Sequence, residues 1–223
     1  MTVEEYINPL SITFRQLADP VRADNSKKYL RDQFGSLGIT AVPFRRAVKD
    51  FVKTYGSPDQ KIIYQLMTFL WSVTYREYQH AGIEILRRKP SLIGKKDIGC
   101  IEMMITTKSW WDTVDAIAVF ICGNYFNRFP EQIIPVTGRW IDSGHLWLMR
   151  SALLFQLKYK DKTDTELLAG YINKVSAHKD FFIRKAIGWV LRDYSKKNPE
   201  WVRSFVKKYP LSGLSYREAT KYL

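Results

Sequence analysis

The chain has 223 residues, of which 46% are hydrophobic and 14% aromatic, a composition that excludes an intrinsically disordered protein. It carries 35 Lys and Arg against 22 Asp and Glu, and the formal net charge of +13 favours a polyanionic partner, nucleic acid first of all. The excess is uneven, because residues 146–223 hold 11 Lys and 5 Arg against 7 acidic residues and so carry +9 of it.

The N-terminal segment MTVEEYINPL begins with acidic residues and lacks the apolar core of a signal peptide. The longest apolar segment, residues 116–126, is too short to cross a bilayer. Cys100 and Cys122 each lie in an apolar run, which is typical of buried free thiols in a reducing compartment. We therefore expect a cytoplasmic protein that does not insert into membranes.

Apolar residues recur at the i, i+3, i+4 and i+7 spacing of amphipathic helices, and strand patterns are nearly absent. The spacing is clearest over four segments, residues 62–73, 77–88, 145–160 and 181–197. Helix starts are predicted near Ser57, Ser109 and Thr163. Pro and Gly separate the helices without any flexible linker, so we expect roughly twelve short helices in one domain, residues 1–223.

A weak internal repeat aligns the small residues of four helix cores. They are separated by 35, 36 and 34 residues, and they are Ala81, Ala116, Ala152 and Ala186. A period in the middle thirties with two helices per unit is typical of an α-solenoid of HEAT-like repeats, which is a curved slab with a concave face. An irregular all-α bundle is the alternative. On a solenoid, one face would be basic and would include Arg150, Lys158, Lys185, Arg192 and Lys196, although solvated charges are the ordinary explanation of such residues.

The stretch TKSWWDTVDAIA, residues 107–118, separates two aspartates by role. Ser109 fits an N-cap and Asp112 the third helical position, which together predict a capping box. Asp115 lies beyond the first turn and shares a helix face with Trp111, so it is either an ion-pair partner or a catalytic carboxylate. Trp110 points about 100° away around the helix and is free to pack inward.

Other chemistries find no support in the motifs. The three histidines, His80, His145 and His178, have no metal-ligand spacing, and there is no CxxC pair. No Gly-rich phosphate loop and no GxSxG sequence occurs. We therefore expect no metal and no cofactor, which leaves carboxylate and aromatic chemistry on a polyanion.

Long ordered segments resemble the AlkD family of bacterial DNA glycosylases, which are HEAT-like-repeat enzymes for alkylated bases. The segments that carry the resemblance are YLRDQFGSLGI, PFRRAVKD, TKSWWDTVDAIA, WLMRSALLFQLKYKDK, KDFFIRKAIGWVLRDYSKKNPEWV and LSYREATKYL. The resemblance implies that Asp115 is the catalytic carboxylate and that Trp111 and Trp189 line its cleft. It places a DNA-contacting arginine at Arg150 and a tyrosine near the DNA at Tyr29. A sister branch of the family lacks these residues, which this sequence keeps.

The resemblance implies a monofunctional glycosylase of base excision repair. It would hydrolyse the glycosidic bond of cationic N3- and N7-alkylpurines, such as 3-methyladenine and 7-methylguanine, in double-stranded DNA. The lesion would stay in the duplex, and a monomer would suffice. Two alternatives stay open: a non-catalytic α-solenoid that binds DNA structures, and a scaffold whose basic face meets an acidic protein.

Overall fold

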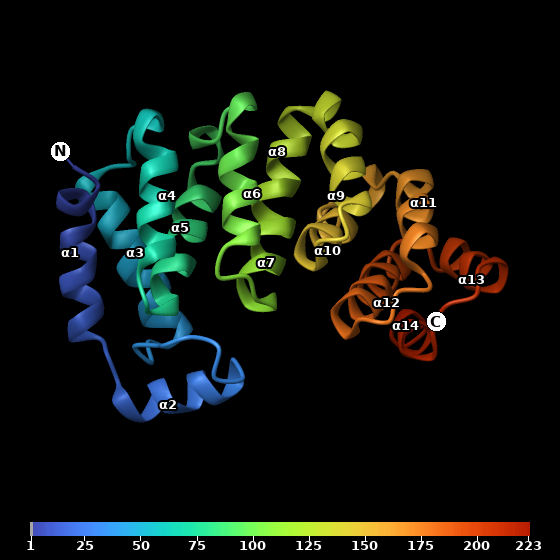
Figure 1. Ribbon diagram of the computed structural model, residues 1–223, viewed down its shortest axis with the longest axis horizontal. Coiled ribbons are helices and arrows are strands. Elements are labelled where there is room, and N and C mark those ends of the chain that lie inside the picture. Colours follow the sequence, from blue (N-terminus) through green and yellow to red (C-terminus); the bar gives the residue numbers. More distant parts are fainter. Residues whose placement is uncertain (1) are drawn as a thin grey trace. The chain divides into compact units, whose positions relative to one another are not determined.

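The computed structural model describes residues 2–223, and these residues form an all-α protein (Figure 1). Within them the one β-contact is an isolated bridge between Gly35 and Tyr75. The chain divides into two compact units, Met1–Lys108 and Ser109–Leu223. The prediction of an all-α fold is confirmed. The predicted single domain and the predicted curved, basic face concern how the two units are arranged, and both stay predictions.

The described part of the first unit, residues 2–108, is built from six α-helices with short 3₁₀ turns between the later ones. These α-helices are α1 (Val3–Gln16), α2 (Pro20–Tyr29), α3 (Ala41–Tyr55), α4 (Ile63–Ser72), α5 (Arg76–Arg88) and α6 (Ile98–Thr106). Its core forms where their apolar faces meet. Trp71 of α4 is fully buried, and its indole N–H donates to the Met104 carbonyl of α6 at 3.0 Å.

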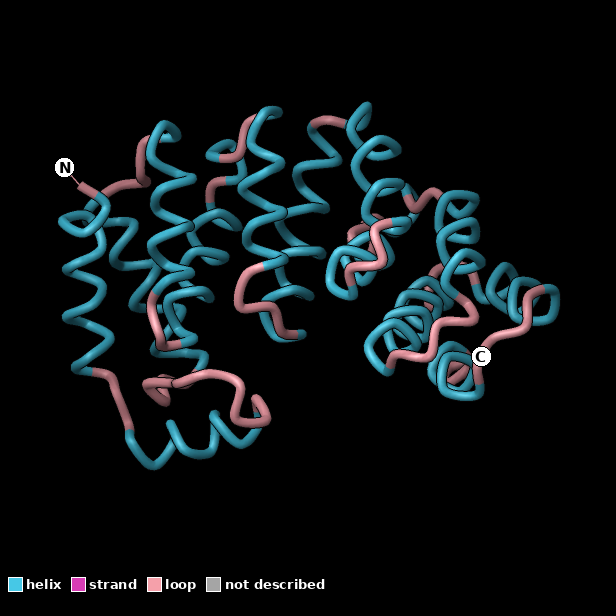
Figure 2. The backbone as a smooth tube through the Cα atoms, in the orientation of Figure 1, coloured by secondary structure: helices cyan, strands magenta, loops and turns pink. Residues whose placement is uncertain are grey.

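A buried carboxylate fixes the loop between α2 and α3, residues 30–40, which is drawn as a loop in Figure 2. Glu77 of α5 accepts hydrogen bonds from the Ser36 hydroxyl at 2.7 Å and from the backbone N–H groups of Leu37 and Gly38 at 2.9 and 3.1 Å. These bonds satisfy backbone donors that a loop cannot pair by itself. In contrast α2 buries none of its own residues.

The second unit, all of whose residues the structure describes, holds eight α-helices, two π-helical segments and short 3₁₀ turns. The α-helices are α7 (Trp111–Ala116), α8 (Gly123–Arg128), α9 (Gly138–Asp142), α10 (Leu146–Leu154), α11 (Thr165–Val175), α12 (Phe181–Ser195), α13 (Pro199–Lys208) and α14 (Gly213–Ala219). The π-helical segments are η4 (Ile117–Cys122) and η6 (Ile133–Thr137). In Figure 1, α10, α12 and α14 follow one another, and α12 packs against both neighbours.

The four aligned alanines lie on α5, α7, α10 and α12. Ala81, Ala152 and Ala186 are no more than 2% exposed, whereas Ala116 is only partly buried. The small-residue face predicted from the repeat is therefore buried in three of the four helices. No helix within residues 2–223 is both long and apolar enough to span a membrane.

The predicted helix starts are displaced by one or two residues. The N-cap of α11 is Asp164 instead of Thr163, and its side chain accepts from the Leu167 N–H. The turn after Ser57 begins with Asp59 at the N-cap. In both cases the N-cap is an aspartate that lies one or two residues after the predicted Ser or Thr, because a carboxylate accepts hydrogen bonds from the free backbone N–H groups equally well.

Candidate active site

Asp115 lies on α7, whose first turn differs from the predicted capping box. The N-cap position is occupied by Trp110, and its side chain makes no capping hydrogen bond. The Trp110 carbonyl accepts the first intrahelical hydrogen bonds, so the helix begins one residue later than a Ser109 N-cap requires. That prediction is wrong by one position. Asp112 nevertheless lies in the first turn, where a carboxylate complements the positive end of the helix dipole.

A π-helical segment begins two residues after Asp115. α7 ends at Ala116, and η4 continues the same helix from Ile117 to Cys122. Such wider turns are rare and occur frequently at functional sites, because the extra residue changes the direction in which nearby side chains point. The amphipathic pattern of the sequence did not predict this turn.

The Asp115 carboxylate is held by Arg150 of α10. Arg150 Nε donates to Oδ1 at 2.7 Å and Nη2 donates to Oδ2 at 2.8 Å, a bidentate pair. The side chains of Arg150 and Asp115 are only 6% and 15% exposed. The remaining terminal nitrogen, Nη1, donates to the backbone carbonyl of Phe182 at the start of α12. Three helices therefore fix one carboxylate.

Burial and charge act on Asp115 in opposite directions. Burial is the largest effect and raises the pKa of Asp115 above the ordinary value of an aspartate. The hydrogen bonds and positive charge of Arg150 lower it, and the negative charge of Asp112 adds a smaller upward contribution. The result is a carboxyl group with a raised pKa, which is typical of functional sites although structural ion pairs also produce it.

Aromatic rings pack around the Arg150 side of this pair. Trp110, Trp147 and Phe182 form a cluster with ring centroids 4.9 to 5.9 Å apart. Trp147 is buried, and Trp110 packs inward as predicted although it keeps some exposure. The buried indole N–H of Trp110 has no hydrogen-bond partner among residues 2–223, a rare feature in a core formed for packing alone.

The two predicted cleft tryptophans are partly exposed, and they lie on α7, which carries Asp115, and on α12, whose Phe182 carbonyl accepts from Arg150. Trp111 is one helical turn before Asp115 on α7. Trp189 is seven residues after Phe182 on α12, which is two turns and about 10 Å along the same helix face. Partial exposure is what a ring that contacts a ligand needs.

Two predicted DNA-binding residues on α12 share a partner that the sequence did not indicate. Lys185 Nζ lies 2.7 Å from Glu218 Oε1, and Arg192 pairs with the other oxygen of the same carboxylate. The Lys185 hydrogen bond is the main cause that lowers the pKa of Glu218. Glu218 lies on α14, so its position next to α12 depends on tertiary packing, which no local motif could reveal.

The other predicted basic or aromatic contacts are exposed side chains. Lys158 is exposed after the end of α10, and Lys196 pairs with Asp193 at 3.2 Å at the end of α12. Tyr29 is 66% exposed at the end of α2, in the first unit. Within residues 2–223 no three His, Cys, Asp or Glu side chains form a group that could hold a metal ion.

The fold and this site define an all-α protein built from helical repeats, with a buried carboxylate held by an arginine beside aromatic rings. Residues 10–223 match the family described as DNA alkylation repair enzyme. The chain belongs to this family, as its resemblance to the AlkD glycosylases predicted. A comparison with curated proteins finds no match.

Solved structures show the same fold. A predicted DNA alkylation repair enzyme from Enterococcus faecalis is 31% identical, with a TM-score of 0.86 over 92% of this chain and 96% of that one. AlkD2 from Streptococcus mutans is 16% identical, with a TM-score of 0.68 over 100% and 99% of the two chains. The smu.31 protein of S. mutans UA159 is also 16% identical, with a TM-score of 0.63 over 94% and 99%. The predicted helical-repeat class is thereby confirmed.

Proposed function

We propose that the protein is a monofunctional DNA glycosylase that removes cationic N3- and N7-alkylpurines from double-stranded DNA. The observation that carries this proposal is the Asp115 carboxylate, which lies just before a π-helical turn and is fixed from one side by Arg150. Membership of the DNA alkylation repair family and the net charge of +13 support DNA as the partner. A cytoplasmic monomer without metal or cofactor is part of the proposal.

The reaction needs no strong general acid, because alkylation at N3 or N7 makes the base positively charged and a good leaving group. The C1′–N bond breaks as its electron pair moves to the base, and positive charge develops on the sugar as in other glycoside hydrolysis. Asp115 stabilises that charge and orients a water whose oxygen attacks C1′. The water gives up a proton, and the products are the free base and an abasic site.

The aromatic residues supply attraction to the same positive charge. Tryptophan faces at Trp111 and Trp189 attract a cationic sugar and base by up to about 2 kcal/mol when water is excluded. A preorganised group such as Asp115 is typically worth ~2.7–4 kcal/mol to the transition state. No lysine is assigned as a Schiff-base nucleophile, so no strand cleavage by a lyase step is expected.

Arg150 has a different role in this proposal from the DNA contact that the resemblance implied. All three nitrogens of its guanidinium already donate to Asp115 or to the Phe182 carbonyl, and the side chain is 6% exposed. These contacts support Arg150 as the residue that positions the catalytic carboxylate and lowers its pKa. A direct contact between Arg150 and a DNA phosphate stays a prediction. It requires an N–H of the same guanidinium that points away from Asp115 and from the Phe182 carbonyl.

The decisive experiment incubates the protein with methylated duplex DNA and measures released 7-methylguanine and 3-methyladenine. Asp115→Asn should lower release by roughly 10²–10³-fold, the effect of removing one preorganised group. Asp112→Asn is the matched control, because Asp112 is one turn earlier on α7 and should retain release. Full release by Asp115→Asn, with both variants folded, would contradict the proposed mechanism.

The buried ion pair also fits a purely structural role, and this keeps a non-catalytic DNA-binding protein as the second candidate. In that case the wild-type protein binds duplex DNA but releases no base from freshly alkylated DNA. A scaffold for an acidic protein would instead show negligible duplex affinity at moderate salt. The base-release assay and one binding titration therefore separate the three functions.

A further inference from the structure

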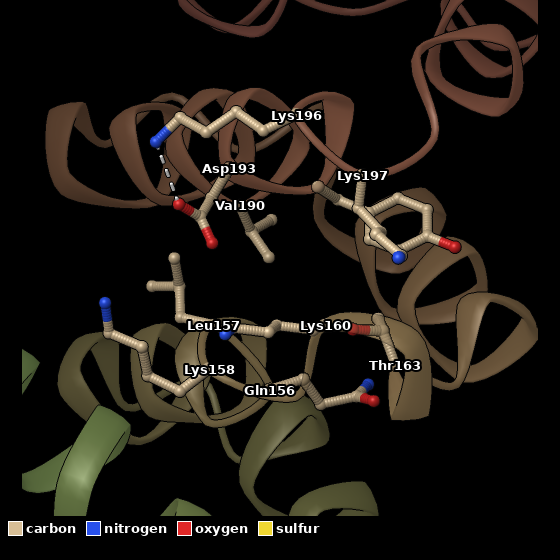
Figure 3. A pocket seen from close by; sticks show the side chains of 10 residues that line it. Gln156, Leu157, Lys158, Lys160, Thr163, Val190, Asp193, Lys196 and Lys197 are labelled. Carbon is tan, nitrogen blue, oxygen red and sulfur yellow. Dashed lines mark hydrogen bonds and ion pairs between the residues drawn. The ribbon is translucent and has the colours of Figure 1, made fainter.

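A concave site in the Ser109–Leu223 unit is lined by residues other than Asp115 and Arg150. It opens between the segment that follows α10 and the last turns of α12, and its cavity volume is about 260 Å³ (Figure 3). We call it the lysine pocket, because four of its lining residues are Lys158, Lys160, Lys196 and Lys197. Figure 3 shows Asp193 and Lys196 on one wall and Lys158 on the opposite wall.

The charges of the lysine pocket are only partly compensated. Lys196 pairs with Asp193 at 3.2 Å, and Lys197 pairs with the exposed Asp161 at 2.6 Å. Lys158 and Lys160 have no carboxylate partner among residues 2–223, and both are exposed. Four lysines against Asp193 and Asp161 leave a formal charge of +2. Ammonium groups around an open concavity favour an anion, and phosphate oxygens are the acceptors that lysine commonly binds.

The backbone at Lys160 also sets this site apart from a solvated charge run. Its φ is 54°, in the left-handed region that favours glycine and that disfavours a residue with a side chain. A lysine therefore stands where glycine would be unstrained. Strained positions of this kind cluster at ligand sites, and here the strained residue is one of the two lysines without a partner among the described residues.

The position along α12 connects the pocket to the proposed active site. Phe182 accepts the hydrogen bond from Arg150, and Asp193 lines the pocket eleven residues later on the same helix. That separation is about 16 Å at 1.5 Å per residue. Phosphates of one DNA strand recur about every 3.4 Å along the helix axis, so roughly five nucleotides of a strand span the same distance.

We propose that the lysine pocket is a phosphate-binding subsite, which takes a backbone phosphate of the DNA several nucleotides from the sugar held near Asp115. The inference rests on the proposed function for the identity of the partner. It adds a second point of attachment, which fixes the position of the strand relative to the carboxylate without reading any base.

The test measures affinity for an unmodified duplex over a series of salt concentrations. The double variant Lys158→Ala/Lys160→Gly should weaken binding about three- to ten-fold and make the slope of log K against log salt shallower by ~0.9 for each phosphate that is no longer bound. The matched control is Lys207→Ala/Lys208→Ala, which removes the same charge from α13 outside the lining of the pocket. Glycine at 160 suits the positive φ, so the double variant should retain its thermal midpoint.

Asp193→Asn gives the opposite expectation, because it removes the one lining carboxylate and should tighten duplex binding. Equal affinities of the double variant and its control would overturn the proposal. A thermal shift of the wild type by inorganic tripolyphosphate, with duplex affinity unaffected by the double variant, would instead assign the pocket to a free oligophosphate and overturn the DNA source. No base release enters these measurements, so failure of the glycosylase proposal is detected separately.

Discussion

Arg150 donates two hydrogen bonds to the Asp115 carboxylate, at 2.7 and 2.8 Å, from a guanidinium that is itself almost completely buried. Desolvation alone would favour a neutral carboxyl group, and the arginine opposes it. Arg150 therefore limits the upward shift in the pKa of Asp115 that burial causes. Removing one member of such a buried pair typically costs ~3–5 kcal/mol, so variants must be checked for folding before activity is compared.

The pair predicts a shift in the pH dependence of base release. Arg150→Gln removes the interactions that lower the pKa of Asp115, so that pKa should rise further. Because the reaction needs the ionised carboxylate, the acid limb of the rate profile should move to higher pH. Single-turnover release of 7-methylguanine, corrected for spontaneous depurination at each pH, measures the shift.

The matched control for this shift is Arg184→Gln. Arg184 lies on α12 and donates to the Ser212 hydroxyl, so the substitution removes a positive charge without removing a bond to Asp115. Its acid limb should coincide with that of the wild type. An unmoved limb in Arg150→Gln would show that Asp115 does not set the ionisation required for release.

Trp111→Ala and Trp189→Ala should lower base release while leaving the fold largely intact. Both rings are partly exposed, and removal of a desolvated cation–π interaction of about 2 kcal/mol corresponds to roughly thirty-fold in rate. The contrasting variant is Trp140→Ala, since Trp140 is fully buried and its loss should cost ~3–5 kcal/mol of stability. Release rates and thermal midpoints measured together distinguish the two groups. A large loss of stability with unchanged release in Trp111→Ala would place that ring in the core.

Glu218→Gln should increase affinity for duplex DNA if Lys185 and Arg192 contact the backbone. The glutamate pairs with both, and its removal frees two positive charges on α12. The freed charges should steepen the dependence of log K on log salt by up to ~0.9 for each phosphate bound. An affinity and slope equal to those of the wild type would assign both basic residues to helix packing instead.

The sequence could predict what depends on local patterns. Helical spacing predicted the all-α class, and the aligned alanines predicted buried positions such as Ala81 and Ala152. Spacing alone also proposed separate roles for Asp112 and Asp115, but the Ser109 capping box on which that proposal rested is wrong by one position. The catalytic assignment of Asp115 came from the resemblance and stays a proposal.

What the sequence could not predict depends on contacts between distant residues. The Phe182 carbonyl that holds Arg150 is a backbone atom, and no residue type encodes its position. Glu218 reaches Lys185 only because α14 packs on α12. The predicted helix starts were wrong by one or two residues, because several neighbouring residues can occupy the N-cap position.

Gly188 tests that packing of α14 on α12. A Cβ built at Gly188 would lie 2.3 Å from the Glu218 Cβ and 3.0 Å from the Ser215 carbonyl oxygen, so the two helices approach too closely for any side chain. Gly188→Ala should destabilise the protein by about 1–3 kcal/mol. Gly170→Ala on α11 is the matched control, because a Cβ there meets nothing within 4 Å and should stabilise the helix by roughly 0.5–1 kcal/mol. Denaturant unfolding of both variants gives the comparison, and equal stabilities would contradict the close approach.

The π-helical segment η4 holds more residues per turn than the regular helix in which Asp115 lies. Deleting one residue of Ile117–Cys122 would let this segment close into a regular α-helix, with the helix on either side near its present orientation. Asp115 would then still face Arg150, whereas a deletion in the regular turns of α7 would rotate it by about 100° relative to the helix that follows. Insertions and deletions of a single codon therefore have unequal consequences along this helix, and η4 is the part of it that tolerates a change of length.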